Sequence, residues 1–201
     1  MASGLGKDYI LRSGAWPWSR HRFVAVDEVD LDIAAGETLG LVGESGAGKT
    51  TVGRMVLGLE APSRGSVLVD GVDIYGMRGR QRRSLRRDVQ VVFQNPHSSL
   101  DPLMTVGQTL AEPLEVHTRW SRDRIEERVA ELLEQVGLAR AVSGRHPGAL
   151  SGGQRQRVAI ARALALDPRL IVCDEPVSAL DVSTQAQVVN LLGDLQQELG
   201  V

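Results

Sequence analysis

The stretch GESGAGKT at residues 43–50 fits the pattern G-x-x-x-x-G-K-[ST], in which a glycine-rich loop opens a helix. Gly46 and Gly48 let the backbone curl so that several N–H groups point inward, and the positive end of the helix adds to them. Lys49 would neutralise the β and γ phosphates of a nucleotide, and the Thr50 hydroxyl would bind Mg²⁺. The stretch therefore predicts a phosphate-binding loop.

The residues on both sides of this loop favour the structural context that the motif needs. The apolar run ETLGLV at 37–42 is typical of a strand buried in a parallel sheet. After the loop, apolar residues recur at helical spacing over 49–59. We therefore expect the order strand, glycine-rich loop, helix.

The middle of the chain separates into a sheet region and a helical region. Runs at 66–70 and 73–75, joined by Gly71, predict an antiparallel hairpin, and 89–93 predicts a further strand. Between about 101 and 150 the apolar residues follow one helical stripe, which indicates a helical insertion between two sheet strands.

After the insertion the sheet resumes. The run LIVC at 170–173 predicts a strand. Ser151 is a favoured cap residue and predicts a helix over about 153–166. A last helix is expected from about 184 to 199, after Ser183.

The composition is that of an ordinary folded protein. With 201 residues, 42% hydrophobic and 24% charged, the chain is neither disordered nor collagen-like. A formal charge of -2 supplies no global field that would attract nucleic acid or anionic lipid. The single cysteine, Cys173, excludes an internal disulfide and a multi-cysteine zinc cluster, and we expect it to be buried in its strand.

Two carboxylates end the strand expected at 170–173. Asp174 at the strand end can hold the Mg²⁺ shell, and Glu175 can orient and polarise an attacking water. Acidic residues often follow strands without such a role, so this interpretation depends on the phosphate loop.

The pentapeptide LSGGQ at 150–154 predicts a second anion site. The Ser151 hydroxyl and the N–H groups of Gly152 and Gly153 meet at the start of a helix, where they suit a γ-phosphate. With these residues in place beside the loop at 43–50, nearly the whole chain resembles the nucleotide-binding domain of ABC ATPases.

The resemblance implies an α/β fold. It would be a P-loop NTPase with a RecA-like core, an antiparallel β subdomain and an inserted helical subdomain. Residues 1–201 would form one nucleotide-binding domain, incomplete at its C-terminus. In the family, the phosphate loop of one subunit and the LSGGQ segment of the other enclose one ATP, so the resemblance also implies ATP hydrolysis at a dimer interface.

Further roles follow from the resemblance alone. Gln94 resembles the Q-loop glutamine, which reaches Mg²⁺ or the attacking water through its amide oxygen. The segment SALD at 178–181 is similar to the D-loop, which places Asp181 at the dimer interface.

An aromatic residue is expected to stack on the adenine. Tyr9 aligns best, and Trp16, Trp18 and Phe23 are its rivals. The residues so implied to bind ATP are Tyr9, Gly43, Ser45, Gly46, Gly48, Lys49, Thr50, Thr51, Ser151, Gly152, Gly153, Gln154 and Asp181. Those implied to bind Mg²⁺ are Thr50, Gln94 and Asp174, and those implied in catalysis are Glu175 and Gln94.

Two segments narrow the resemblance to one group of transporters. Residues 36–45 and 95–102 are similar to the ATPases of dipeptide, oligopeptide and nickel importers. This implies a peptide or a related small solute as cargo and a homodimer or a heterodimer with another ABC ATPase. It also implies transmembrane permease subunits, an extracytoplasmic solute-binding protein, and a place at the cytoplasmic face of the membrane, bound through the permease.

Other polar residues favour plainer interpretations. Six arginines lie between 78 and 87, but no aromatic residue is interleaved with them, so a solvated face is favoured over a nucleic-acid site. None of the four histidines has metal-ligand spacing.

One family feature does not appear in the chain. The family has a strand after the D-loop helix, ending in a histidine that contacts the γ-phosphate, whereas only 26 residues follow Glu175 here. We therefore expect a fragment of 201 residues with poor ATPase activity, or an inactive one. A non-transporter ABC ATPase of the DNA repair or translation type stays open, and a small-molecule kinase would leave 150–154 unexplained.

Overall fold

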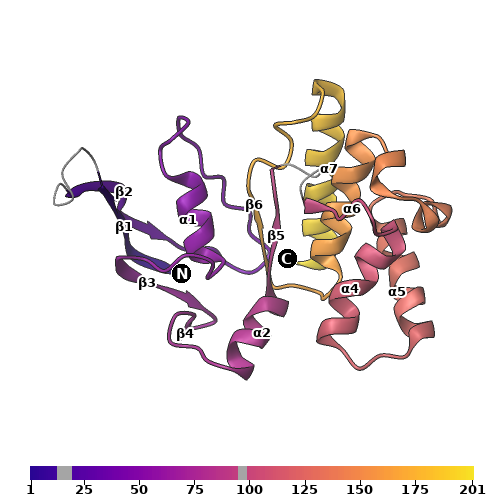
Figure 1. Cartoon of the computed structure of the whole chain (residues 1–201), viewed down its shortest axis with the longest axis horizontal. Coiled ribbons are helices and arrows are strands. Elements are labelled where there is room, and N and C mark those ends of the chain that lie inside the picture. Colours follow the sequence, from indigo (N-terminus) through magenta and orange to yellow (C-terminus); the bar gives the residue numbers. More distant parts are fainter. Residues whose placement is uncertain (13–19, 95–98) are drawn as a thin grey trace. The chain divides into compact units, whose positions relative to one another are not determined.

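The computed structural model describes residues 1–12, 20–94 and 99–201. The chain divides into two compact units, Met1–Leu85 and Arg86–Val201 (Figure 1), and each is described by itself. The prediction of a single domain over residues 1–201 stays a prediction.

An antiparallel sheet forms the base of the first unit. Among the described residues it has four strands in the order β2-β1-β3-β4. These are β1 (Ala2–Arg12), β2 (Arg20–Leu31), β3 (Arg64–Val69) and β4 (Val72–Asp73). Asp70 and Gly71 both have positive φ, as the two central residues of a tight hairpin turn require, so the hairpin predicted around Gly71 is confirmed.

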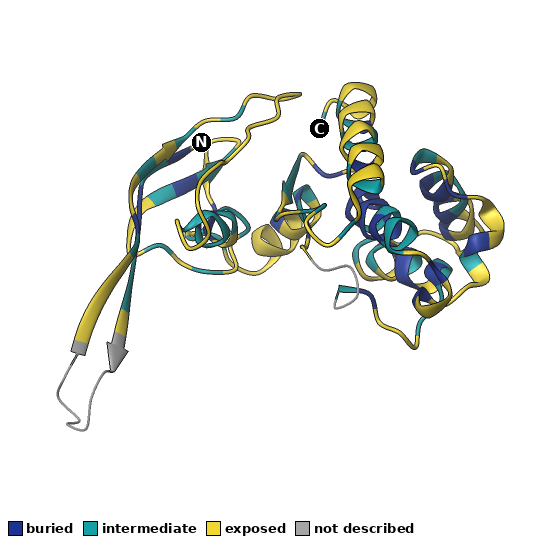
Figure 2. Ribbon diagram, turned by 90° about the horizontal axis from the view of Figure 1, so that it is seen from above, coloured by how far each residue is buried: buried dark blue, intermediate teal, exposed yellow. Residues whose placement is uncertain are grey.

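Helix α1 (Lys49–Val56) contacts β1 and β2. Its buried residues Val52 and Met55 lie one turn apart, and Leu5 and Val26 are buried residues of the two strands (Figure 2). The apolar spacing predicted after the glycine-rich loop is therefore the face that fixes this helix on the sheet.

The second unit combines a small parallel sheet with helices. Strands β5 (Val89–Val92) and β6 (Leu170–Cys173) pair in parallel, as expected for strands separated by a helical insertion. The helical elements are α4 (Val106–His117), α5 (Arg122–Gln135), η1 (Arg140–Gly144), η2 (Pro147–Ala149), α6 (Gly152–Leu164) and α7 (Val182–Leu199). The helical region predicted between 101 and 150 is therefore confirmed.

The core of this unit lies between its helices. The stripe predicted on α5 places Leu132 and Leu133 in the interior, fully shielded from solvent. They belong to one cluster with Leu110 of α4 and Ile160 of α6 (Figure 2). Fully burying one such side chain stabilises a fold by roughly 1.5–3 kcal/mol, so this packing dominates the stability of the unit.

The strand predicted at 37–42 is wrong. These residues belong to no strand of either described sheet, and Val42 is 94% exposed. An apolar run becomes a strand only where a neighbouring strand supplies backbone hydrogen bonds and another layer covers its side chains. The described part of the first unit supplies neither a neighbouring strand nor a covering layer to residues 37–42.

The start of the last helix also differs from the prediction. Helix α7 begins at Val182, and its N-cap is Asp181, whose carboxylate accepts the Thr184 N–H at 2.9 Å. Serine and aspartate are both favoured caps, and the extended backbone at Asp181 makes the aspartate the cap rather than Ser183.

Gly65 should tolerate no side chain. It has φ +81°, and a Cβ there would lie 2.3 Å from the Gly4 carbonyl oxygen of the neighbouring strand. We expect Gly65→Ala to lower the free energy of unfolding by about 3 kcal/mol or more in urea titrations followed by circular dichroism.

Gly71→Ala is the matched control. Gly71 has φ +76°, but a Cβ at this position would meet nothing within 4 Å, so the variant should lose only about 1–2 kcal/mol for the left-handed backbone. Equal losses in both variants would show that the contact with Gly4 is not the constraint.

Candidate nucleotide-binding site

The predicted phosphate loop connects directly to α1. Gly46 has φ +84° and Gly48 has φ +89°, so the backbone takes the left-handed turns that only glycine adopts freely. The Lys49 ammonium turns back into the loop and donates to the carbonyl oxygens of Gly43 at 2.7 Å and Glu44 at 2.8 Å. This arrangement holds the cation inside the curl of the loop, where a phosphate would meet it.

Gly48 is also where the loop meets the sheet. A Cβ at this position would lie 2.4 Å from the Ala25 carbonyl oxygen of β2. No residue with a side chain fits between the two backbones without moving one of them. The motif glycine is therefore required by packing as well as by the curl of the loop.

Tyr9 lies on β1, and its hydroxyl donates to the Glu60 carboxylate at 2.5 Å. Phe23 sits directly opposite Tyr9 on β2 and is half exposed. Trp16 and Trp18 lie outside the described residues. Adenine stacking by Tyr9 stays a prediction.

The carboxyl end of β6 forms a polar cluster in the second unit. Glu175 follows Asp174 and has φ +45°, an uncommon conformation for a residue with a side chain. Its carboxylate accepts a 2.6 Å hydrogen bond from the Gln94 side-chain amide. The two residues predicted to act in catalysis are thus in direct contact.

Ser178 is a member of this cluster to which the sequence patterns assigned no role. Its hydroxyl donates to the Glu175 backbone carbonyl at 3.2 Å and accepts from the Gln94 amide at 3.2 Å. The only sequence signal was its place as the first residue of the SALD segment. Ser178 therefore connects that segment to the catalytic pair.

The LSGGQ segment begins α6 as predicted. The Ser151 hydroxyl accepts the Gln154 N–H at 3.2 Å, and the Gln154 side chain accepts the Ser151 N–H at 3.1 Å. This reciprocal capping box satisfies two backbone donors at the helix start. A Cβ on Gly153 would lie 2.6 Å from Thr184 of α7, so the second glycine is required by the contact between these helices.

Asp181 has a clear structural role as the cap of α7. Its carboxylate accepts from the hydroxyls of Ser183 at 2.6 Å and Thr184 at 2.8 Å. The Ser183 hydroxyl, followed by the backbone and hydroxyl of Thr184, lowers the pKa of Asp181 to about 2. Its contact with ATP at a dimer interface stays a prediction.

The predicted site residues are divided between the two units. Tyr9 and the loop residues 43–51 belong to Met1–Leu85, and Gln94, residues 150–154 and residues 174–181 belong to Arg86–Val201. Among the predicted site residues, the structure brings Gln94 of the second unit into contact with Glu175. The assignments to ATP and Mg²⁺ remain predictions.

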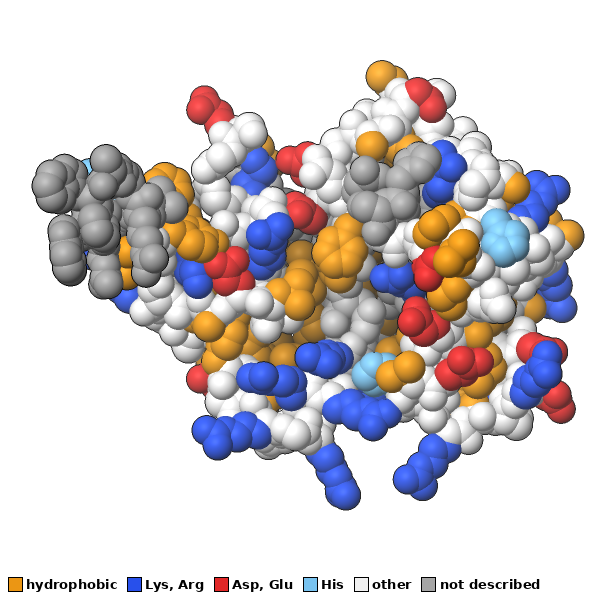
Figure 3. Space-filling view, viewed as in Figure 1, with side chains coloured by type: hydrophobic (Ala, Val, Ile, Leu, Met, Phe, Trp, Pro, Cys, Tyr) orange, Lys and Arg blue, Asp and Glu red, His pale blue; other side chains and the backbone are white. Residues whose placement is uncertain are grey.

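Two expectations outside the site have different outcomes. The side chain of Cys173 is exposed rather than buried, because the two-stranded sheet of the described residues leaves the end of β6 uncovered. Helix α2 (Arg80–Asp88) buries Leu85 and exposes its arginines (Figure 3), which agrees with the predicted solvated face. Among the described residues, no three or more His, Cys, Asp or Glu side chains group together in a way that could hold a metal ion.

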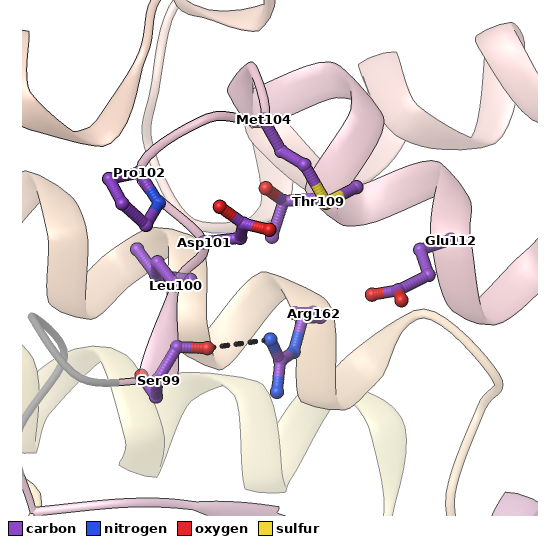
Figure 4. A pocket seen from close by; sticks show the side chains of 8 residues that line it. All are labelled: Ser99, Leu100, Asp101, Pro102, Met104, Thr109, Glu112 and Arg162. Atoms are coloured by element: carbon purple, nitrogen blue, oxygen red, sulfur yellow. Dashed lines mark hydrogen bonds between the residues drawn. The ribbon is translucent and has the colours of Figure 1, made fainter.

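A separate cavity of about 380 Å³ lies between α4 and α6 (Figure 4). Its polar lining includes Asp101, Glu112 of α4 and Arg162 of α6, and Arg162 donates to the Ser99 carbonyl at 2.8 Å. None of the residues predicted to bind ATP or Mg²⁺ lines it.

Comparison with known families agrees with the motifs. The ABC transporter family model matches residues 26–178, which include the phosphate loop, the LSGGQ segment and the acidic end of β6. The chain belongs to the ABC transporter family.

Similar curated proteins are ATP-binding proteins of importers and related transporters. The chain is 49% identical over 98% of its length to a probable peptide ABC transporter ATP-binding protein of Sinorhizobium fredii. It is 50% identical over 92% of its length to the oligopeptide transport ATP-binding protein OppF of Escherichia coli. In both cases it spans 56% of the relative.

Solved ABC cassettes share the fold. The dimeric ATP-binding cassette MJ0796 in a post-hydrolysis state, bound to ADP and Pi, superposes with a TM-score of 0.82 at 32% identity. That match covers 99% of this chain and 83% of the cassette. The cbiO1 protein of Clostridium perfringens gives a TM-score of 0.80 at 28% identity, over 100% of this chain and 76% of its own. The α/β ATPase fold implied by the sequence is therefore confirmed.

The cap of α7 should make stability depend on pH. The folded-state pKa of Asp181 is lowered to about 2 from an ordinary value near 3.8. Its contribution to stability is therefore complete above the ordinary value and is lost as the pH falls toward 2. We expect wild type to lose its advantage over Asp181→Asn across this window in urea titrations.

Asp181→Asn is a matched variant, because its amide oxygen still caps the helix but does not titrate. Asp181→Ala, which removes the cap, should be less stable than Asp181→Asn at every pH. A constant difference between wild type and Asp181→Asn from pH 5 to pH 2 would contradict the assigned charge.

Proposed function

We propose that this chain binds and hydrolyses ATP at a dimer interface and that hydrolysis powers an ABC importer for peptides or a related small solute. The observation that carries this proposal is the loop at 43–50, with its left-handed glycines and with Lys49 turned into the curl. This geometry suits the phosphates of a nucleotide.

Phosphate binding would give the Lys49 ammonium new hydrogen-bond acceptors. The Lys49 ammonium now donates to the carbonyls of Gly43 and Glu44, and the β and γ phosphates would replace these acceptors. The ammonium and the phosphate oxygens carry opposite charges, so their Coulomb attraction adds to the hydrogen bonds and the exchange favours the nucleotide. The N–H groups at the start of α1 add further donors.

Hydrolysis would depend on Glu175 and Gln94. The Glu175 carboxylate can accept a proton from an attacking water, and its bond to the Gln94 amide holds it in one orientation. Ser178 supports the same residue through its backbone. Phosphoryl transfer depends mostly on positioning and charge stabilisation, so a fixed carboxylate is what the reaction needs.

The residues assigned to Mg²⁺ have suitable chemistry. Thr50 offers a hydroxyl oxygen, Asp174 a carboxylate and Gln94 an amide oxygen, and Mg²⁺ prefers such hard oxygen ligands. The two hydrogen bonds of Gln94 to Glu175 and Ser178 use its amide nitrogen, which leaves the amide oxygen for the cation. When bound, Mg²⁺ would neutralise charge on the phosphates.

The second anion site supports a shared nucleotide. Gly152 and Gly153 begin α6, and their N–H groups together with the Ser151 hydroxyl would hold a γ-phosphate presented by another subunit. The similar cassette MJ0796 was solved as a dimer, bound to ADP and Pi. The other subunit would be a second copy or another ABC ATPase.

The transport role rests on the relatives. Those at about half identity are named for peptide, oligopeptide and glutathione transport, and none of these names concerns nucleic acid. We infer that the chain works at the cytoplasmic face of the membrane, bound to permease subunits and served by an extracytoplasmic solute-binding protein. Among the described helices, none has the length and apolar character of a membrane span.

Removal of the loop cation should strongly weaken nucleotide binding. Lys49→Ala leaves the triphosphate without the charged donor of the loop, so we expect ATP affinity to fall about 100-fold, the upper part of the range for a lost hydrogen bond to a charged group. Isothermal titration with Mg-ATP measures it. Unchanged affinity with an unchanged circular dichroism spectrum would reject the assignment of this loop.

Blocked hydrolysis should trap ATP between two chains. Glu175→Gln keeps the size and the hydrogen-bonding capacity of the side chain but cannot accept a proton, so ATP should induce a dimer. Adding Ser151→Arg should dissolve this dimer, because the arginine fills the second anion site. Light scattering that shows the same mass with and without ATP in both proteins would exclude a shared site.

A further inference from the structure

Tyr9 is held through its hydroxyl by a residue that no motif includes. The hydroxyl donates to the Glu60 carboxylate at 2.5 Å, across 51 residues of sequence. Glu60 follows the end of α1, the helix whose start forms the phosphate loop. The bond therefore ties the aromatic ring of β1 to the far end of the phosphate-loop helix.

Lys7 completes the contact from the same strand. Its ammonium lies 3.2 Å from the Glu60 carboxylate and donates to the Ala61 carbonyl at 2.7 Å. The Lys7 and Glu60 side chains are only 15% and 21% exposed, so solvent screens this ion pair less than a surface pair. The Lys7 ammonium also lies 5.4 Å from the centre of the Tyr9 ring, within the range of a cation–π contact.

A second tyrosine fixes the backbone that carries Glu60. The Tyr75 hydroxyl lies 2.6 Å from the carbonyl oxygens of both Met55 and Glu60. Burial, followed by the charge of Glu60, raises the pKa of Tyr75 to about 12, so this hydroxyl keeps its proton and stays a donor. The hydrogen bond from Tyr9, followed by Lys7, lowers the pKa of Glu60, so its carboxylate stays charged.

We propose that Glu60 is a positioning residue for base recognition, which together with Lys7 holds the Tyr9 ring at a set distance from the phosphate loop, where the ring can stack on the adenine. This inference rests on the proposed binding of ATP. Its physical basis is that the loop fixes the phosphates at one end of α1, while Glu60 fixes the ring from the other end. A bound nucleotide must place its phosphates in the loop and its base on the Tyr9 ring at the same time.

The test separates the base from the phosphates. ATP and inorganic tripolyphosphate are titrated, each with Mg²⁺, into the wild-type chain and into variants that fold with unchanged circular dichroism spectra. Glu60→Ala should weaken ATP about tenfold, near the lower end of the effect of one lost hydrogen bond to a charged group, and leave tripolyphosphate within about twofold. Tyr9→Phe, which keeps the ring and removes the hydroxyl, should do the same.

Two further variants set the scale of the effect. Tyr9→Ala removes the ring itself and should weaken ATP about 10- to 100-fold, as for other lost base–aromatic stacks. Glu60→Gln keeps an acceptor for the Tyr9 hydroxyl and should recover part of the loss in Glu60→Ala. Combining Tyr9→Phe with Glu60→Ala should weaken ATP by less than the product of the two single effects, because both remove the hydrogen bond between Tyr9 and Glu60, whereas only Glu60→Ala also removes the ion pair with Lys7.

The possible results are distinct. If Tyr9→Ala weakens ATP but Tyr9→Phe and Glu60→Ala do not, the Glu60 contact has no part in base recognition and the inference is wrong. If Glu60→Ala weakens ATP and tripolyphosphate equally, Glu60 acts on the loop rather than on the ring, which also overturns it. If Lys49→Ala leaves both ligands bound as in wild type, the proposed function itself fails.

Discussion

The close approach of Gly48 to the Ala25 carbonyl is the constraint on which the phosphate loop depends. A Cβ would lie 2.4 Å from that oxygen, so at Gly48 the backbone that begins α1 directly approaches the backbone of β2. The contact fixes the position of the Lys49 backbone. It therefore also fixes the point from which the Lys49 ammonium reaches the Gly43 carbonyl. At the other end of α1, the bond from Tyr9 to Glu60 ties the chain to β1. The helix is thus anchored to the sheet at both ends.

Sequence patterns predicted the elements that are decided locally. The glycine-rich loop, the Ser151 cap and the apolar stripe of α5 each follow from residues within a few turns of one another. The strand predicted at 37–42 was wrong because a strand depends on partners that sequence spacing does not reveal. The predicted burial of Cys173 was wrong for the same reason, since burial of a strand residue depends on the layers that cover it.

The candidate site shows the same division. Its motif residues can be recognised in the sequence because binding and catalysis require their spacing. The residues that hold the motif residues in place have no such spacing and cannot be recognised in this way. Glu175 meets Gln94 across 81 residues, and Ser178 meets Gln94 across 84. Glu60 reaches Tyr9 from the opposite end of a helix. Such partners carry no signature of their own in one sequence, because their side chains are ordinary and only the fold makes them neighbours.

The capping box of α6 has a consequence for the timing of assembly. The Ser151 hydroxyl accepts the Gln154 N–H with a lone pair, and this use leaves its proton available to a phosphate oxygen. Folding has already fixed the Ser151 side chain in the rotamer that a γ-phosphate would contact. The conformational entropy of ordering this serine is therefore lost during folding rather than during association of the subunits. An encounter between two nucleotide-loaded chains would find this half of the interface preorganised.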